Sequence, residues 1–279
     1  MNIPEKSLNQ HQVGEISLFS FPGLAARKRL RHFISSRQGG VSREPFNSLN
    51  IGFHVGDNAF DVLQNRRMLF DAARADLYRA IFPFQQHTAN VVVVDESMRG
   101  RGALEQETAP DHVDALVTHV PGIWLCVQMA DCVPVLLYDP VQHVVGVVHA
   151  GWKSPLRRIV QVTLDKMSQT WGSRPGDMLA GIGPSNGPCC YEVGEDVRME
   201  SLRALGSVQG IMHPSGQPGK YIFDQWQANR QQLLEYGLHE NQIEVSGVCT
   251  QCHRHWFFSS RADHGHTGRF MLGAMLTRA

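Results

Sequence analysis

Two residues able to bind a metal, or to act as nucleophile and base, flank a single apolar hairpin in this sequence. The hairpin is predicted from two β-branched runs, Val133–Tyr138 and His143–Val148, which are separated by a short segment containing Pro140. A turn centred just after Pro140 would place Cys132 directly opposite His149 across the ladder. A thiolate and an imidazole would then meet at one end of a sheet, as half of a metal site or as a nucleophile and its base.

Two further residues are candidates for the same chemistry. His87 follows Gln85-Gln86 and precedes the apolar run 91–94, so it lies at the entrance of a predicted strand. A single histidine in that position is more often structural than a ligand. Arg37 stands before Gly39-Gly40, where glycines would bare backbone amides beside a guanidinium. That arrangement suits an anion, although a tight turn with a solvated arginine is the simpler alternative.

The elements that must position these residues are mainly strands. Apolar runs of strand length follow one another along the chain, which favours an α+β fold with mixed, largely antiparallel sheets over a doubly wound one. The first helix is expected to have Asp57 as its N-cap and to expose Asn65 and Arg66. The predicted strands are 16–21, 91–94, 114–118, 123–127, 133–138, 143–148, 178–182, 242–248 and 269–276, and the predicted helices are 57–75, 154–171, 195–205 and 224–236.

Composition argues against several classes of protein. With 279 residues the chain is expected to form a single catalytic domain, and its 26 basic and 26 acidic residues cancel. No basic run is interleaved with aromatic residues, so nucleic acid is not expected as a partner. The N-terminal segment lacks the apolar core of a signal peptide, and no run approaches the length of a membrane span, so we expect a cytoplasmic protein without membrane contact. Its six cysteines are then expected to be thiols.

Two cysteine patterns are weaker than they look. The run Cys249-Thr-Gln-Cys252-His253 spells the attachment pattern of c-type haem, but haem is attached outside the cytoplasm. A structural zinc bound by this Cys-x-x-Cys and His255 would have one cysteine pair without a second. Adjacent side chains of an extended chain point to opposite sides, so at most one of Cys189 and Cys190 is expected to face any site.

Three enzyme classes fail on the spacing of their motifs. The pairs His253-Arg-His255 and His264-Gly-His266 resemble those of copper oxidases, but a trinuclear copper cluster needs more of them. The zinc deaminase signature requires His-x-Glu, which does not occur in this sequence. No Walker or dinucleotide glycine pattern occurs either.

Taken together, the motifs resemble one family, the laccase-domain purine nucleoside phosphorylases, formerly described as multicopper polyphenol oxidases. They occur in the family's order from about residue 30 to the C-terminus. Each motif alone is weak, but the set is specific. The matching pieces are Ser36-Arg37-Gln38-Gly39-Gly40-Val41-Ser42, Ser48-Leu49-Asn50-Ile51-Gly52, His54-Val55-Gly56-Asp57, Asn65-Arg66, Gln85-Gln86-His87, Asp114-Ala115-Leu116-Val117-Thr118, Ala130-Asp131-Cys132-Val133-Pro134, His149-Ala150-Gly151-Trp152, Gly187-Pro188-Cys189-Cys190-Tyr191-Glu192-Val193, Phe257-Phe258-Ser259-Ser260-Arg261 and Thr267-Gly268-Arg269.

The resemblance implies a multilayer α/β/β/α-type sandwich and a zinc site made of His87, Cys132 and His149, with copper as the alternative metal. Three protein ligands would leave the fourth tetrahedral position free, which is typical of catalytic zinc. The resemblance also implies phosphorolysis of adenosine, inosine and S-methyl-5'-thioadenosine to free base and ribose 1-phosphate, with adenosine deamination as a further activity. The expected partners are therefore a purine nucleoside and phosphate.

Phosphorolysis also needs a cation that holds phosphate and an acid that protonates the leaving base. Arg37 is the first candidate for the cation and Arg261 the second. The pattern assigns no acid, and Asp131 and Glu192 are the candidates that remain. The chain departs from the family at Thr88 (for glycine), Lys153-Ser154 (for Arg-Gly), Asn186 (for an apolar residue) and Ala262 (for a second arginine), and the last change would weaken phosphate binding if that arginine contacts phosphate.

Three other functions fit the same residues. In a cysteine hydrolase, Cys132 would be the nucleophile and His149 its base. A metal-dependent binding module would keep the metal but show no turnover. A copper-dependent polyphenol oxidase would follow the family's earlier description. A nucleophilic cysteine is alkylated by iodoacetamide and works in the presence of a chelator, whereas a metal ligand is protected and its activity is lost to the chelator.

Overall fold

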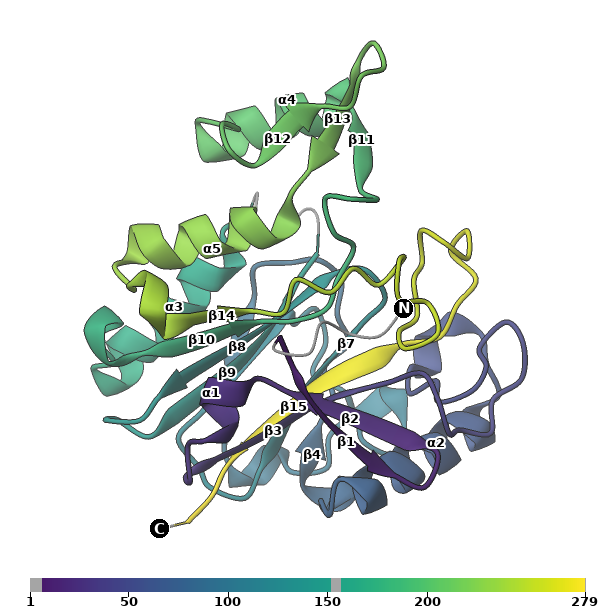
Figure 1. Ribbon diagram of the computed structural model, residues 1–279. Helices are drawn as coiled ribbons and strands as arrows, with labels where there is room; N and C mark the ends of the chain where they lie inside the picture. Colours follow the sequence, from purple (N-terminus) through teal and green to yellow (C-terminus); the bar gives the residue numbers. More distant parts are fainter. Residues whose placement is uncertain (1–6, 152–156, 279) are drawn as a thin grey trace.

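Two six-stranded sheets, packed face to face and covered by helices on their outer sides, form the body of the molecule (Figure 1). The computed structural model describes residues 7–151 and 157–278. Most strand pairs are antiparallel, with parallel pairs near the sheet edges. The prediction of an α+β fold with mixed, largely antiparallel sheets is confirmed.

The first sheet has the strand order β1-β2-β3-β15-β7-β4. Strand β15 comes from the C-terminal end of the chain and lies between β3 and β7, antiparallel to both. The last part of the sequence is therefore at the centre of this sheet. The bounds are β1 Asn9–Val13, β2 Ile16–Ser20, β3 Leu30–Ser35, β4 Ala80–Ile81, β7 Trp124–Met129 and β15 Phe270–Leu276.

The second sheet has the order β14-β10-β8-β9-β6-β5 and carries the predicted hairpin at its centre. Strands β5 and β6 are parallel, as are β10 and β14, while the inner pairs are antiparallel. The bounds are β5 Val91–Val93, β6 Ala115–Thr118, β8 Val133–Asp139, β9 Val144–Ala150, β10 Leu179–Ile182 and β14 Ile243–Val245.

Apolar layers lie between the sheets and under the helices. The inner layer joins Leu125 and Leu272 of the first sheet to Leu136 and Val147 of the second. Helix α2 (Ala59–Ala72) covers the outer face of the first sheet, and α3 (Ile159–Trp171) and α5 (Gln225–Tyr236) cover that of the second. Strands β8 and β9 are buried along their whole length because both faces of their sheet are covered. This explains why they appear in the sequence as continuous apolar runs.

A smaller unit stands beyond the sandwich, at the top of Figure 1. It consists of the sheet β11-β13-β12 and helix α4, with its own small apolar cluster around Phe223. The bounds of this unit are β11 Glu192–Gly194, α4 Glu195–Leu205, β12 Met212–Pro214 and β13 Lys220–Phe223.

Short helical elements occur elsewhere in the chain. They are helix α1 Pro22–Ala25 and 3₁₀ turns at Phe53–Val55, Leu77–Arg79, Glu96–Met98, Gln106–Thr108, Pro175–Asp177 and Glu240–Gln242.

Two predictions about α2 are wrong. Its N-cap is Asn58, whose side chain accepts a hydrogen bond from a backbone N–H in the first turn. Asp57 instead accepts hydrogen bonds from the side chains of Ser42 and Asn50 in the preceding loop. Asn65 and Arg66 are buried rather than exposed, and the Arg66 guanidinium donates to three backbone carbonyls. Buried polar groups need such partners, and a pattern of apolar residues does not reveal them.

Helices α4 and α5 agree with prediction, whereas α3 begins later than predicted, at Ile159, because Arg158 before it has a left-handed φ of 54°. Helix α4 has the predicted bounds, and α5 begins after the predicted N-cap Asp224. Helix α3 ends at Gly172 as predicted, while the start of the predicted helix 154–171 lies partly outside the described residues. Within residues 7–151 and 157–278, no helix is long and apolar enough to cross a membrane.

The register of the β8–β9 hairpin differs from the predicted one by two residues. Asp139 pairs with Val144, so the loop has four residues, and His149 lies opposite Pro134 instead of Cys132. The Asp139 Oδ1 accepts hydrogen bonds from two backbone N–H groups of this loop. The loop has the predicted length but begins at Pro140 instead of Asp139, because Asp139 is the last residue of β8 and its side chain satisfies the loop amides.

Candidate metal centre and its pocket

Three metal-binding side chains from distant parts of the chain converge at one end of the β8–β9 hairpin. His87 lies in the loop between β4 and β5, Cys132 directly precedes β8, and His149 lies in β9. The Nε2 atom of His87 is 3.5 Å from the Sγ atom of Cys132, and the ring centroids of the two histidines are 5.0 Å apart. The ligand atoms of all three residues lie within 4.8 Å of one another. The structure thus brings together the three residues that the sequence analysis named as ligands.

The error in register did not separate Cys132 from His149. Side chains alternate between the two faces of a strand, so a shift of two residues keeps each side chain on its face. Cys132 is therefore a diagonal neighbour of His149, two residues before Pro134, which lies opposite His149. Gly151 leaves room for His87 beside Cys132, because a Cβ atom there would lie 2.2 Å from the His87 ring and 3.1 Å from the Cys132 Sγ.

A buried carboxylate, Asp114, holds two of the three ligands in place. Its Oδ1 is 2.8 Å from the Nδ1 of His149, which keeps the proton on Nδ1 and leaves Nε2 to face the other ligands. The backbone N–H groups of Gln86, His87 and Thr88 donate to the same carboxylate at 3.2, 3.0 and 2.6 Å. His87 has a left-handed φ of 56°, and these hydrogen bonds hold it in that uncommon conformation.

The charges of this site depend on one another. Burial alone would raise the pKa of the Cys132 thiol, but the neighbouring histidines lower it to about 6. Burial alone would lower the pKa of His149, but the Cys132 thiolate and the Asp114 carboxylate raise it to about 9. Burial also opposes ionisation of Asp114, but hydrogen bonds from His149 and Thr88 lower its pKa to about 2. Near neutral pH the metal-free site therefore holds a thiolate, an imidazolium and a carboxylate.

The three ligands form part of the wall of a cavity of about 460 Å³, a volume typical of small-molecule sites. Two arginines lie on the same wall. The Arg261 guanidinium stacks on the Tyr191 ring, 5.2 Å from its centroid. Burial lowers the pKa of Arg269, whereas the Cys132 and Asp131 charges raise it. The described lining residues are His54, Gln85, His87, Gln128, Met129, Ala130, Asp131, Cys132, His149, Asn186, Tyr191, Gln225, Ser260, Arg261 and Arg269.

The two acids named from the sequence differ in position. Asp131 lines the pocket, and burial raises the pKa of its carboxyl above the ordinary value. Both its oxygens are engaged, one by the Thr250 hydroxyl at 2.6 Å and the other by the backbone N–H of Arg261 at 2.6 Å. Glu192 is not among the described residues that line the cavity. Asp131 is thus placed to hold the Arg261 segment against the pocket.

Arg37, the first sequence candidate for phosphate, is not in this pocket. It lines a different cavity of about 690 Å³. Its guanidinium donates to the backbone carbonyls of Asn47 and Arg254 and lies 4.5 Å from the centroid of the Phe258 ring. These contacts hold loops together, so Arg37 is not the solvated side chain of the simpler alternative either. The second candidate, Arg261, does lie beside the three ligands.

Sequence reasoning missed three residues of this site. Asp114 stands directly before a strand that is buried throughout, and an acid in that position needs partners, which is a signal the sequence does contain. Arg269 belongs to a motif that was recognised, but no role followed from it. Gln128 lies in β7 of the first sheet and reaches the pocket through the packing of the two sheets, so no local pattern marks it.

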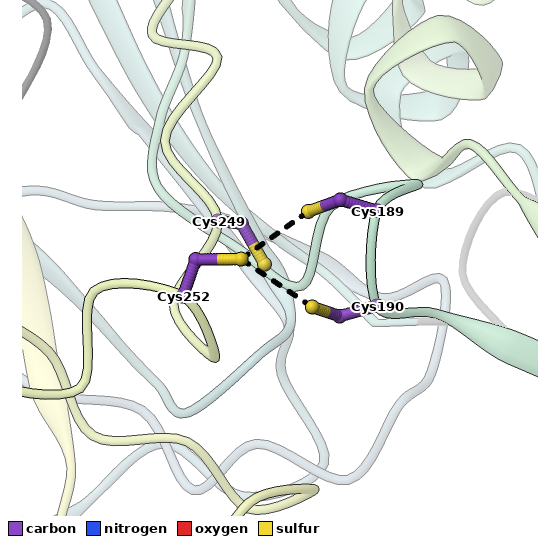
Figure 2. Close-up of side chains that lie close together, drawn as sticks. All are labelled: Cys189, Cys190, Cys249 and Cys252. Atoms are coloured by element: carbon purple, nitrogen blue, oxygen red, sulfur yellow. Dashed lines mark hydrogen bonds between the residues drawn. The ribbon is translucent and has the colours of Figure 1, made fainter.

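Among the described residues, one other group of metal-binding side chains converges, and it consists of four cysteines (Figure 2). The histidine pairs His253/His255 and His264/His266 belong to neither group. Within the part of the chain that the structure describes, these histidines therefore do not form the trinuclear copper cluster of a multicopper oxidase.

Known proteins resemble this chain over most of its length. The sequence pattern of the family described as "Multi-copper polyphenol oxidoreductase laccase" matches residues 31–277. The chain is 39% identical to the purine nucleoside phosphorylase YlmD of Bacillus subtilis strain 168 over 237 residues, 85% of each protein. It is 35% identical to the adenosine deaminase RL5 of an unknown prokaryotic organism, over 86% of this chain and 91% of that protein. The crystal structure of YlmD from Geobacillus stearothermophilus matches with a TM-score of 0.90 at 35% identity, covering 96% of this chain and 98% of that one.

Proposed function

The chain belongs to the family described as multicopper polyphenol oxidoreductase laccase, in which its relatives are named purine nucleoside phosphorylases, and from this we propose that it is a zinc-dependent purine nucleoside phosphorylase. Its substrates are adenosine, inosine and S-methyl-5'-thioadenosine, each with phosphate. Its products are the free base and the ribose 1-phosphate or its methylthio derivative. The observation that carries the proposal is a single pocket with three metal ligands and two arginines on its wall.

The donor set of this pocket fits zinc. Zinc bonds of about 2.3 Å to sulfur and about 2.0 Å to nitrogen place tetrahedral S and N ligands about 3.5 Å apart. The Sγ of Cys132 and the Nε2 of His87 are 3.5 Å apart without any rearrangement. The Nδ1 of His149 is held by a carboxylate, as is usual for metal-bound histidines. Bound zinc would supply a Lewis acid beside the substrate.

A copper-dependent function is less well supported by these three ligands. One thiolate and two imidazoles also occur in blue-copper centres, but oxidation of phenols by a laccase requires a trinuclear copper cluster in addition. The described residues bring no third group of ligands together. The family's description as an oxidoreductase therefore has no counterpart in the described part of this chain.

Phosphate binding is supported by the two arginines of the pocket. A phosphate dianion requires fixed cations, and arginine holds it through paired charge-assisted hydrogen bonds. Arg261 is oriented by stacking on Tyr191 and by a hydrogen bond from its Nη2 to the Glu192 carbonyl. The Nη1 of Arg269 donates to two nearby carbonyls, which fixes one end of this guanidinium. Arg269 gives the pocket a second cation although Ala262 is not an arginine.

Two side-chain amides of the pocket support binding of a nucleoside. The Oε1 of Gln128 and the Nδ2 of Asn186 are buried and lack a hydrogen-bond partner within the described residues. Such atoms cost free energy unless a ligand or water satisfies them. A purine carries ring nitrogens and exocyclic groups that can serve as partners for both. Asn186, where the family has an apolar residue, thus adds a polar group to this site.

In phosphorolysis, a phosphate oxygen forms a bond to the anomeric carbon of the ribose while the bond from that carbon to the base nitrogen breaks. The leaving base takes up the proton that hydrogen phosphate gives up, and the two negative charges of phosphate remain on the sugar phosphate. The arginines hold the phosphate close to the sugar, which converts an encounter of two solutes into a reaction within one complex.

Adenosine deamination is the second candidate function, and the relative named adenosine deaminase favours it. In that reaction water adds to C6 of the purine and ammonia leaves, so phosphate takes no part. A fixed cation for phosphate is then unnecessary, whereas the metal ligands are required. The two activities would share one pocket and differ in their dependence on Arg261.

A cysteine hydrolase remains the competing interpretation, because a thiolate beside an imidazolium is also the resting state of such enzymes. Treatment with iodoacetamide separates the two. A metal-bound Cys132 should resist alkylation until a chelator removes the metal, and the chelator should abolish turnover. Rapid alkylation with full activity in the presence of a chelator would establish the hydrolase instead.

The proposed phosphorylase is tested by incubating metal-analysed protein with adenosine, with and without phosphate, and by identifying the products. Adenine and ribose 1-phosphate should appear only with phosphate, whereas inosine should appear in both conditions. Cys132→Ala should lose the metal of this pocket and both activities while remaining folded. Adenine formation at an equal rate without phosphate, or full turnover by metal-free protein, would contradict the proposal.

A further inference from the structure

Four cysteines from two separate segments face one another outside the pocket (Figure 2). Cys189 and Cys190 lie in the loop that follows β10, and Cys249 and Cys252 lie in the segment that follows β14. The Sγ of Cys252 is 3.5 Å from that of Cys189 and 3.4 Å from that of Cys190. All four Sγ atoms lie within 4.8 Å of one another, and all four cysteines are free of disulfides.

Tight turns explain how neighbouring cysteines can face the same point. The backbone N–H of Cys190 and that of the next residue both donate to the carbonyl of Gly187, at 3.0 Å each, so the chain is wound here and not extended. The prediction that at most one of Cys189 and Cys190 faces any site is therefore wrong. Cys249 and Cys252 lie about one helical turn apart, which places their side chains on the same side.

Gly187 allows the two segments to meet. A Cβ atom at this position would lie 2.5 Å from the Trp226 ring and 3.1 Å from the Cβ of Cys249. The N–H of Gly187 donates to the Sγ of Cys249 at 3.3 Å. Backbone donors of this kind stabilise a thiolate, and they commonly surround metal-bound cysteines.

We propose that these four cysteines bind one zinc ion in a structural site. Zinc–sulfur bonds of about 2.3 Å place the sulfurs of a tetrahedral site about 3.8 Å apart. The contacts of 3.4 and 3.5 Å and the limit of 4.8 Å for the whole group bracket that spacing. Iron–sulfur clusters distribute their cysteines over two or more irons, so a group this compact suits a single ion. Four thiolates fill the tetrahedron and leave no open position, which is typical of structural zinc.

Zinc binding at this site releases the thiol protons of the cysteines. The zinc ion replaces the protons of the four thiols, which pass to solvent, and no oxidant or reductant takes part. The competing process is oxidation, in which Cys252 would form a disulfide with Cys189 or Cys190 and two hydrogens would be lost to an oxidant. Cys252, which the sequence analysis considered only in a zinc site with a single cysteine pair, is central to both outcomes.

The proposed zinc would stabilise the segments that form one wall of the catalytic pocket. Thr250, next to Cys249, donates to the Asp131 carboxylate at 2.6 Å. The N–H of Asn186 donates to the Asp131 carbonyl at 2.9 Å. Asp131 directly precedes the ligand Cys132, so the two segments that carry the four cysteines also hold the loop of the first metal site. This inference concerns a second metal and does not depend on the proposed function.

Metal analysis of four purified variants tests the proposal without reference to activity. The protein is produced with zinc and reductant, freed of loosely bound metal by gel filtration, and analysed by inductively coupled plasma mass spectrometry. Wild type should contain about two zinc ions per chain, one for each ligand group. Cys252→Ser should retain one, Cys132→Ala should retain one, and the double variant should retain none. Cys126→Ala is the control, because Cys126 is buried in the apolar layer under α2, and this variant should retain both ions.

A second measurement keeps the test decisive if Cys252→Ser fails to fold. In Cys132→Ala, which keeps the four-cysteine group intact, titration with an organomercurial should release the remaining zinc in step with four modified thiols. Cobalt bound to the same protein should show the intense sulfur-to-cobalt charge-transfer absorption of a tetrathiolate site. The proposal is overturned if Cys132→Ala contains no zinc, if Cys252→Ser contains as much zinc as wild type, or if the reduced protein carries a disulfide at Cys252.

Discussion

Replacing Asp114 by asparagine tests how far the ligand geometry depends on one buried carboxylate. Asp114 accepts hydrogen bonds from His149 and from three consecutive backbone N–H groups of the His87 loop. An asparagine has nearly the same shape but supplies one acceptor oxygen and an NH₂ group. Whichever way it is turned, at least two donors that the carboxylate served would face the NH₂ group.

The magnitude can be estimated in two ways. Each buried donor left unsatisfied costs about 1–3 kcal/mol, so the loss of two costs about 2–6 kcal/mol. The pKa of Asp114 is lowered from 3.8 to about 2, and that shift corresponds to roughly 2.5 kcal/mol at 1.36 kcal/mol per pKa unit. Because the folded-state pKa is lowered, this stabilisation is present above about pH 4 and is lost as the pH falls through about 2. We therefore expect Asp114→Asn to lower the free energy of unfolding of the metal-free protein by about 2–4 kcal/mol near neutral pH.

The zinc affinity of Asp114→Asn should fall together with its free energy of unfolding. Partners that orient metal-bound histidines are typically worth about 10–100-fold in affinity, and Asp114 orients His149 and the His87 loop together. The assays are urea unfolding of metal-free protein and zinc competition against a chromophoric chelator. Asp111→Asn is the matched control, because Asp111 is exposed and contacts the neighbouring His112. If Asp114→Asn unfolds and binds zinc as Asp111→Asn does, the role assigned to this carboxylate is refuted.

Three further predictions concern the pocket. Gly151→Ala should weaken zinc binding by at least about tenfold, because its Cβ would come 2.2 Å from the His87 ring. Gly176→Ala is the control and should leave zinc binding unchanged, because a Cβ there meets nothing within 4 Å. Equal zinc affinities of the two variants would contradict the geometry. Arg261→Ala should slow phosphorolysis by about 10–100-fold and spare deamination, while Arg37→Ala should alter neither by more than a few-fold; a phosphate-specific loss in Arg37→Ala would reverse this assignment. Between pH 6 and 9 the zinc affinity of this site should rise by about tenfold per pH unit, because zinc must displace a proton from His149, whose pKa is about 9. The affinity is measured in a variant without the four-cysteine site. An affinity that is independent of pH in this range would show that His149 binds zinc without losing a proton.

The β8–β9 hairpin shows which part of the fold could be predicted from sequence. Two apolar β-branched runs fix the existence of the strands and the face on which each side chain lies, because that face depends only on alternation. The register depends on the loop, and the loop depends on hydrogen bonds from the Asp139 side chain, which composition does not specify. Cys132 and His149 were still placed on one face because the error was an even number of residues.

The sequence predicted which three metal-binding side chains come together, but it did not predict the residues that hold them in place. His87, Cys132 and His149 lie in motifs of the family, and their residue types already indicate metal binding. Asp114 accepts hydrogen bonds from three backbone N–H groups, and Arg269 reaches the pocket from a position directly before β15 of the other sheet. Such contacts follow from packing of segments far apart in the sequence. No local pattern encodes them.

The four cysteines mark a different limit. Cys189 and Cys190 were judged as neighbours on an extended chain, but hydrogen bonds to the Gly187 carbonyl wind this segment into a turn. Two segments separated by about 60 residues, with each pair insufficient for a metal site by itself, were therefore not combined. A pair of cysteines in one segment gains significance only when the fold places a second pair beside it.

The central claim, that this pocket joins phosphate to a nucleoside sugar, is tested most directly by following phosphate oxygens. Zinc-loaded protein is incubated with inosine and phosphate labelled with ¹⁸O at every oxygen, and the sugar phosphate is analysed by mass spectrometry. Direct attack of phosphate on the anomeric carbon predicts hypoxanthine and a ribose 1-phosphate that keeps all four labelled oxygens, including the one bonded to the sugar. Free ribose as the product, or an unlabelled oxygen between sugar and phosphorus, would show that water had cleaved the nucleoside and would contradict the account.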